Sequence, residues 1–257
     1  METNSENNEP FSTERTATIW SLVVLAIFLV FVSFTVLSAV SSVRSTPPLA
    51  NCQSNMRNVA LAILNYEAVN QHFPVAATRS EDGAPSKSWR VEILPQLELQ
   101  YIRDRYDDSL PWDAPANLEV AKTQIPLFRC PAARQPSEKT ELSTTNYVLI
   151  TGPGTVFPDG KHSVASDIKD GFSNTIIMME INDSDIAWSE PRDLTVDEAI
   201  ALFNRPASVR KKHPTNHKSG RVVAFADGHI DFAPEDTPPE VLRALFHIDD
   251  GIAATLK

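Results

Sequence analysis

Residues 16–43 read TATIWSLVVLAIFLVFVSFTVLSAVSSV, a segment without a charged residue, a proline or a glycine. Arg15 precedes this segment and Arg44 follows it. About 20 apolar residues in a helix cross the roughly 30 Å hydrocarbon core of a bilayer, and a helix satisfies its own backbone hydrogen bonds inside lipid. The segment therefore predicts a transmembrane helix, with the rest of the chain carried behind it.

A cleaved secretory signal is the alternative reading of this segment. Such a signal has a basic N-terminal region and an apolar stretch of about 7–15 residues. Here residues 1–15 are acidic on balance, and the strongly apolar part, residues 19–37, is longer than that. These flanks favour a retained anchor. The expected organisation is a polar disordered tail at residues 1–15, a transmembrane helix at 16–43 and a head domain at 44–257.

The charge of the chain limits its partners. The formal net charge is −10, whereas a general nucleic-acid binder needs a broad basic surface. We therefore expect the lipid bilayer as a partner and no nucleic acid. Nineteen prolines against eight glycines further indicate a loop-rich head with rigid turns.

The head reads as an α+β domain. Apolar residues at Leu49, Cys52, Met56, Val59, Ile63 and Tyr66 recur every three or four positions, which predicts a helix over 49–70. Helical runs are also expected at 89–106, kinked by a proline, and at 116–123. Strands are predicted at 125–130, 146–150 and 175–181, together with a hairpin closed by Asp227-Gly228. The sequences at 195–198 and 237–240 are typical of capping boxes that open helices.

The two cysteines, Cys52 and Cys130, fit neither a zinc-ribbon nor a C-x-x-C spacing. If the head lies outside the cytoplasm, they predict one disulfide, which closes a long loop and stabilises the fold by about 4 kcal/mol. The alternative is two unrelated buried thiols, the usual state in the cytoplasm. An anchored domain is usually displayed outside, and this favours the disulfide.

Two further groups of residues suggest binding sites. The first, near the predicted hairpin, could ligate a metal and comprises His217, Asp227, His229 and Asp231. An Asp-Gly turn needs no metal, so we expect none. The second is a basic run that could dock on anionic lipid or polysaccharide, or simply form a solvated loop: Arg205, Arg210, Lys211, Lys212, Lys218 and Arg221. We see no nucleophile motif, and the acids Asp167, Asp170 and Glu180 alone do not indicate a hydrolase.

An ordered set of motifs runs through the head. It comprises residues 52–58, His72-Phe73-Pro74, Ser88-Trp89-Arg90-Val91, Phe128-Arg129-Cys130-Pro131, Thr145-Asn146-Tyr147, residues 152–155 and 167–180, and His217 nine residues before Asp227-Gly228. This set resembles the bacterial prepilin-like family of unknown function (DUF1559), whose C-terminal signature is H-x9-D-G. The resemblance implies a pilin-like layout, in which the N-terminal transmembrane helix is followed by a second helix packed on a small, mainly antiparallel sheet. Family members often carry a prepilin leader with a glycine before a phenylalanine. Here Pro10 precedes Phe11, so we expect a permanent anchor.

These observations favour a single-pass, pseudopilin-like envelope protein with a structural or assembly role, no catalytic activity and no cofactor. Its partners would be the bilayer and other envelope or pseudopilin-like proteins. The cysteine pair and the resemblance favour a head outside the cytoplasmic membrane, although Arg44 and Arg57 oppose that orientation under the positive-inside rule. The alternative function is an anchored module that binds a solute or glycan, using Trp89, Trp112 and Trp188.

Overall fold

The computed structural model describes residues 20, 22–32, 48–80, 83, 85–133, 141–182, 184–203, 205, 217 and 219–256. The chain divides into two units, Met1–Pro47 and Pro48–Lys257. In the first unit, Trp20 and residues 22–32 are helical with exposed side chains. Within the ranges given above, no helix is both long and apolar enough to cross a membrane. Most of the predicted span, and the whole tail at 1–15, lies outside the described residues, so both stay predictions.

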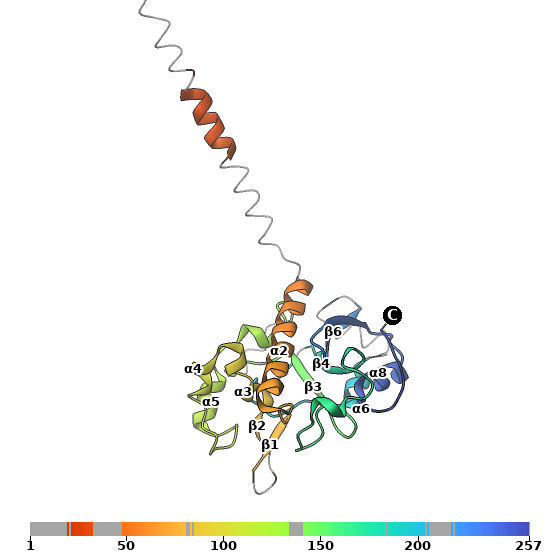
Figure 1. The fold of residues 1–257 in the computed structure, drawn as a ribbon. Helices are drawn as coiled ribbons and strands as arrows, with labels where there is room; N and C mark the ends of the chain where they lie inside the picture. Colours follow the sequence, from red (N-terminus) through yellow and green to blue (C-terminus); the bar gives the residue numbers. More distant parts are fainter. Residues whose placement is uncertain are drawn as a thin grey trace, which may run out of the picture. The chain divides into compact units, whose positions relative to one another are not determined.

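A five-stranded sheet forms the centre of the second unit (Figure 1). In spatial order its strands are β5 (Leu194–Thr195), β3 (Tyr147–Thr151), β4 (Ile176–Glu180), β6 (Gly220–Phe225) and β7 (Ile230–Pro234). β3, β4, β6 and β7 pair in an antiparallel manner, and only β5 runs parallel to its neighbour β3. The predicted α+β class and mainly antiparallel sheet are therefore confirmed for the head.

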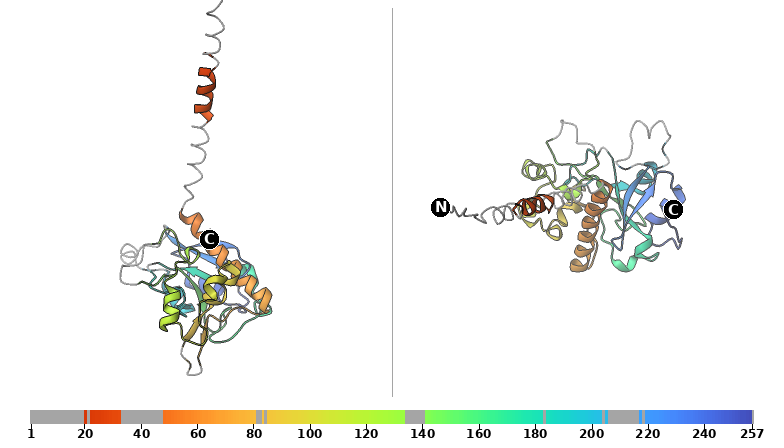
Figure 2. Two further views of the ribbon diagram at one scale, coloured as in Figure 1. Left: turned by 90° about the vertical axis from the view of Figure 1, so that its left-hand side faces the viewer. Right: turned by 90° about the horizontal axis from the view of Figure 1, so that it is seen from above.

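Helices cover both faces of this sheet. The long helix α2 (Pro48–Asn70) packs on one face, whereas α6 (Val196–Ala201) and α8 (Pro239–Phe246) pack on the other (Figures 1 and 2). Two separate cores result. We call them the α2-side core and the α6/α8-side core. Strands buried on both faces read as nearly continuous apolar runs, which explains the sequences of β3, β4 and β6.

Strand periodicity assigns side chains to these two cores. In β3, Tyr147 and Leu149 belong to the α2-side core, whereas Val148 and Ile150 belong to the α6/α8-side core. In β6, residues 222 and 224 face α2, and residues 223 and 225 face α6 and α8. β4 departs from simple alternation because its pairing with β6 shifts register between Ile176 and Met178.

The predicted helix over 49–70 is confirmed as α2. Its buried residues include Cys52, Met56, Val59 and Ile63, which form the expected stripe. The helix ends where Gln71 adopts a positive φ of 63°, a left-handed conformation common just after a helix C-terminus.

The hairpin and the first capping box are also as predicted. Gly228 has a φ of +85° in the turn between β6 and β7, which glycine adopts without steric cost. Thr195 Oγ1 accepts a hydrogen bond from the Glu198 N–H, and the Glu198 carboxylate accepts one from the Thr195 N–H. This reciprocal pair satisfies backbone donors at the start of α6.

Three other predictions need correction. Residues 125–130 contain the 3-10 helix η2 (Pro126–Phe128) and no strand; Pro126 lacks the N–H that a strand ladder needs. The second capping box is absent, because Pro238 occupies the N-cap of α8 and the Thr237 hydroxyl donates to the Pro234 carbonyl. The run 89–106 is three short pieces: α3 (Trp89–Glu92), η1 (Pro95–Leu97) and α4 (Gln100–Arg103).

Shorter elements complete the head. A small hairpin pairs β1 (Ala77–Arg79) with β2 (Pro85–Ser88). The helical run predicted at 116–123 is α5 (Pro115–Ala121). Two more 3-10 turns, η3 (Ala165–Asp167) and η4 (Phe172–Asn174), lie between β3 and β4 in the sequence.

Candidate functional site

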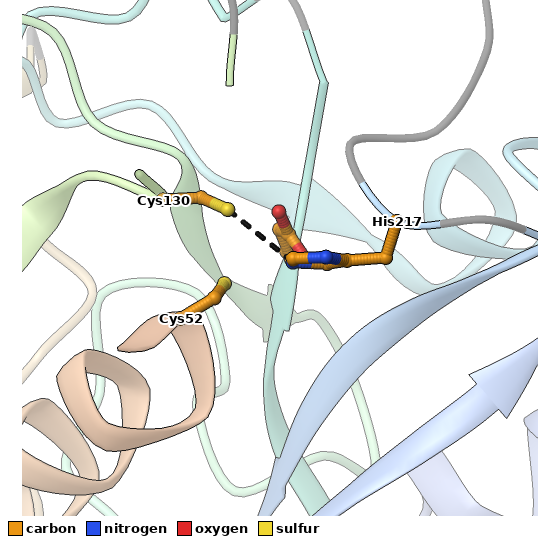
Figure 3. A group of neighbouring side chains, drawn as sticks. Cys52, Cys130 and His217 are labelled. Carbon is orange, nitrogen blue, oxygen red and sulfur yellow. Dashed lines mark hydrogen bonds and ion pairs between the residues drawn. The ribbon is translucent and has the colours of Figure 1, made fainter. Parts of the chain in front are cut away.

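Four side chains that are far apart in the sequence meet beside the N-terminal half of α2. Cys52 comes from α2, Cys130 from the segment after η2, Glu180 from the end of β4, and His217 from the residues before β6. Figure 3 shows the two sulfurs and the His217 ring pointing toward one another. We call these four residues the thiol–imidazole cluster. Each belongs to a different segment, so the cluster exists only in the folded head.

Local structure places each member. Cys52 lies on the buried stripe of α2, and the Cys130 N–H donates to the Asn146 side-chain oxygen at 3.2 Å. The backbone of His217 pairs with Gly220 in an isolated antiparallel bridge. A Cβ on Gly220 would come within 2.4 Å of the Phe232 ring. Only glycine therefore fits at the residue that holds His217 against the start of β6.

The cluster is tight. One potential ligand atom from each residue lies within 4.8 Å of all the others. His217 Nε2 is 3.3 Å from Cys130 Sγ and 3.3 Å from a Glu180 carboxylate oxygen. Around it, the Tyr147 hydroxyl lies 3.2 Å from Cys52 Sγ and donates to the Cys52 carbonyl. The same Glu180 oxygen accepts from the Val222 N–H at 3.4 Å.

The two cysteines have opposite protonation tendencies. The neighbouring Cys52 thiol lowers the pKa of Cys130; burial raises it, but the hydrogen bond with His217 helps bring that pKa to about 4. The proximity of the Cys130 sulfur, together with burial, raises the pKa of Cys52 above its ordinary value. Burial lowers the pKa of His217, but the contacts with Cys130 and Glu180 outweigh it and the pKa is raised. One thiolate and one thiol beside an imidazole can ligate a soft metal ion or undergo oxidation.

The predicted pairing of Cys52 with Cys130 is thus spatially possible. Both are buried free thiols in the structure, and a disulfide would need the sulfurs about 2.0 Å apart. The bond itself stays a prediction.

The candidate ligand set around the hairpin, where we expected no metal, is not assembled. His217 turns into the thiol–imidazole cluster, whereas Asp227 and His229 interact with each other at the exposed turn, 2.5 Å apart between Nδ1 and Oδ1. Asp231 accepts a hydrogen bond from the Phe232 N–H instead. Grouping His217 with the turn residues by sequence was misleading. His217 lies before the first residue of β6, whereas Asp227 and His229 lie beyond its last residue.

The basic run does not form a continuous exposed patch in the described residues. Arg221 is 1% exposed and donates to the Glu180 carbonyl and the Asn182 side chain. Arg205 pairs with Glu235 at 2.7 Å. The remaining members lie outside the described residues: Arg210, Lys211, Lys212 and Lys218. The interpretation of Arg221 as a solvated or docking residue is therefore wrong.

The other singled-out acids are separate from one another. The Asp167 carboxylate accepts from the Val164 N–H, and the Asp170 carboxylate accepts from the N–H groups of residues 250 and 251. Only Glu180 joins a cluster. The sequence signal for Glu180 was its place as a charged residue at the end of the apolar run of β4, a strand that is buried on both faces.

A cavity of about 460 Å³ opens beside the β1–β2 hairpin. Its lining includes Trp112, Arg79, Asp159, Glu190, Arg192 and Asp193. Trp89 and Trp188 are fully buried and do not line it. Trp89 Nε1 donates to Asp193, and Trp188 Nε1 donates to the Thr123 carbonyl. Of the three tryptophans considered for binding, only Trp112 is placed to contact a ligand.

A buried ion pair supports the wall of this cavity. Arg90 Nη2 lies 2.7 Å from Asp193 Oδ1, with side-chain exposures of 0% and 4%. Burial raises the pKa of Asp193 despite the opposing charge of Arg90. The same carboxylate oxygen accepts from the Leu149 N–H at 2.9 Å. These bonds fix the start of β5 against β3.

Comparison with known proteins gives one match. A family model described as "Protein of unknown function (DUF1559)" matches residues 49–201, which is more than half of the chain. No curated protein and no solved structure matches the chain. The matched range includes α2, β3, β4 and three members of the thiol–imidazole cluster. The chain therefore belongs to the DUF1559 family of proteins of unknown function.

Proposed function

We propose that this chain is a single-pass, pseudopilin-like envelope protein whose head lies outside the cytoplasmic membrane and has a structural or assembly role. The observation that carries the proposal is the packing of α2. This 23-residue helix follows the apolar segment 16–43 in the sequence, and its buried stripe packs on the head sheet. A helix-on-sheet head behind an apolar segment is the layout that a pilin-like protein requires.

Membrane extraction tests the anchor. The full chain should stay in the pellet after an alkaline carbonate wash of bacterial membranes. A Leu25→Lys/Phe28→Lys double variant should move to the aqueous fraction, because each lysine at the centre of a span costs about 3 kcal/mol. A Leu25→Met/Phe28→Leu variant is the matched control. Intact wild-type protein in the aqueous fraction, with its first 43 residues still attached, would contradict the anchor.

Topology and assembly need separate measurements. A protease added to spheroplasts should remove a C-terminal tag if the head is outside. Photocrosslinkers at Leu61 and Val69, which are exposed apolar residues of α2, should give the same envelope partner if α2 takes part in assembly. A crosslinker at Glu240, which is exposed on α8, serves as the comparison. Crosslinks to lipid alone from both α2 positions would remove the assembly role.

The cavity beside the β1–β2 hairpin favours a second function, binding of a solute or glycan. Ligand sites are concave and combine apolar walls with a few placed polar groups, and here one indole ring stands among five charged side chains. A glycan array probed with the detergent-solubilised full chain tests this function. Binding should be lost in Trp112→Ala and kept in Tyr101→Ala, an exposed aromatic elsewhere on the head. Equal binding by both variants would exclude the cavity.

A further inference from the structure

We propose that Cys52, Cys130, Glu180 and His217 form a structural zinc site that ties α2 to the sheet. The four residues offer two sulfurs, one nitrogen and one oxygen. Zn²⁺ takes Cys, His and carboxylate ligands in a tetrahedral arrangement, and closed four-ligand sites of this kind are structural. A donor set with two thiolates selects zinc over magnesium or calcium, which prefer oxygen.

Two of the distances between donors match the edges of a tetrahedron around a single ion. With zinc bonds of 2.0–2.3 Å, neighbouring ligand atoms lie about 3.3–3.8 Å apart. The distances from His217 Nε2 to Cys130 Sγ and to Glu180 Oε2 are both 3.3 Å. A charge-assisted N–H···O bond is shorter, at about 2.7–2.9 Å. His217 and Glu180 are therefore spaced as two ligands of one ion and not as an ideal ion pair.

The burial of the four side chains favours a bound cation. The exposed fractions are 0% for Cys52, 2% for Cys130, 1% for Glu180 and 6% for His217. Buried anionic groups are costly unless a cation compensates them. Two thiolates, one carboxylate and neutral imidazole around Zn²⁺ leave one negative charge. The buried guanidinium of Arg221, which donates to the Glu180 carbonyl at 3.2 Å, lies close enough to balance it.

An outer shell of hydrogen bonds holds the donors in place. The Tyr147 hydroxyl contacts Cys52 Sγ, the Val222 N–H donates to Glu180, and the Asn146 side chain accepts from the Cys130 N–H. Such partners orient the ligands and typically change metal affinity by 10–100-fold when removed. Because α2, β4 and the segments carrying Cys130 and His217 all contribute a ligand, the ion would crosslink four segments that are distant in the sequence.

Metal content is the direct test. The full chain, purified in detergent with reductant and without chelator, should contain about one zinc per chain. Replacement by Co²⁺ should give sulfur-to-cobalt charge-transfer absorption and the intense red d–d bands of a tetrahedral site. Cys130→Ser and His217→Asn should each lower zinc affinity by about 100-fold or more. The matched control, His229→Asn, alters an exposed imidazole and should keep full zinc content.

A conservative variant keeps the test decisive if ligand variants fail to fold. Tyr147→Phe removes only the hydroxyl at Cys52 Sγ and should lower zinc affinity by about 10-fold. Wild-type protein with two free thiols that binds neither zinc nor cobalt would overturn the proposal. So would isolation of a Cys52–Cys130 disulfide whose reduction restores no metal uptake, or zinc content that is unchanged in His217→Asn. Membrane anchoring is measured separately, so the failure of one proposal leaves the other standing.

Discussion

The two faces of the central sheet are closed by different means. The α6/α8-side core consists of apolar side chains that include Val148, Met179, Phe225, Leu242 and Phe246, and the buried guanidinium of Arg221 lies against its Phe203 ring. The α2-side core has a similar apolar part, but the thiol–imidazole cluster and the Tyr147 hydroxyl are buried beside it. Apolar contacts tolerate many sequences of similar volume, whereas buried polar groups must each find a partner. The difference is that, among the described residues, the α2 side brings together cysteine, histidine and glutamate side chains of the kinds that ligate a metal ion.

Breaking a buried ion pair next to the α2-side core should have the largest effect. Asp193→Ala leaves the fully buried guanidinium of Arg90 without its partner, and this should lower the free energy of unfolding by about 3–5 kcal/mol. Urea denaturation of the full chain in detergent measures the loss. The matched control is Asp185→Ala, since Asp185 is 84% exposed and pairs with Arg192 on the surface. Equal losses of stability in the two variants would contradict the expectation that the buried ion pair matters more than the exposed one.

A mutation that creates a cavity in the α6/α8-side core should lower the free energy of unfolding slightly less. Leu242→Ala removes a fully buried side chain from the α6/α8-side core and should destabilise the head by about 3 kcal/mol. The loss should be the same with and without a chelator, because no cluster residue lies on this face. Glu240→Ala on the exposed side of α8 should change little. A loss in Leu242→Ala that disappears on chelation would mean that the two cores are not independent.

Chelation should act on the α2 side alone. Free zinc at 100 times its dissociation constant stabilises the folded state by about 2.7 kcal/mol, and a chelator should remove that contribution. The melting temperature should therefore fall in wild type and in Leu242→Ala, but not in Cys130→Ser. Calorimetry with and without chelator measures this. A chelator effect that persists in Cys130→Ser would assign the metal to another part of the chain.

The smallest expected effect concerns the start of α6. Thr195→Ala removes the N-cap hydroxyl that bonds Glu198 and should cost about 1 kcal/mol at pH 7. Hydrogen bonds from Thr195 lower the pKa of Glu198. A lowered folded-state pKa gives stability that is present above the ordinary glutamate pKa of about 4.3 and lost as the pH falls through the folded value. The difference between wild type and variant should thus shrink below about pH 4, and a constant difference would contradict the contribution of the Glu198 carboxylate to the cap.

Local patterns in the sequence predict much of the fold but little of the cluster. The stripe of α2, the Asp227-Gly228 turn and the Thr195–Glu198 box each depend on residues within a few positions, so a short window contains the cause. The strand prediction for residues 125–130 was wrong because an apolar run alone does not distinguish a strand from a buried turn with a proline.

The thiol–imidazole cluster could not be recognised from spacing. Its members come from four segments, and Cys130 and His217 are 87 positions apart. His217 was grouped with Asp227 and His229 because they are near in sequence, but β-strand geometry and the bridge to Gly220 direct it to Cys130 instead. The proximity of the two cysteines agrees with the sequence, whereas the predicted disulfide stays a prediction. The participation of Glu180 depends on tertiary structure alone.

The irregularity in β4 decides which chemistry the sheet can support. Ile177 and the next residue, Met178, both face α2, after which alternation resumes with Met179 on the opposite side. That one-residue slip sets the phase of the strand's end, so that its terminal carboxylate meets sulfur and imidazole. In a regularly alternating strand the same glutamate would point to the opposite face of the sheet, away from Cys52, Cys130 and His217. A single backbone offset thus places the Glu180 carboxylate in the thiol–imidazole cluster.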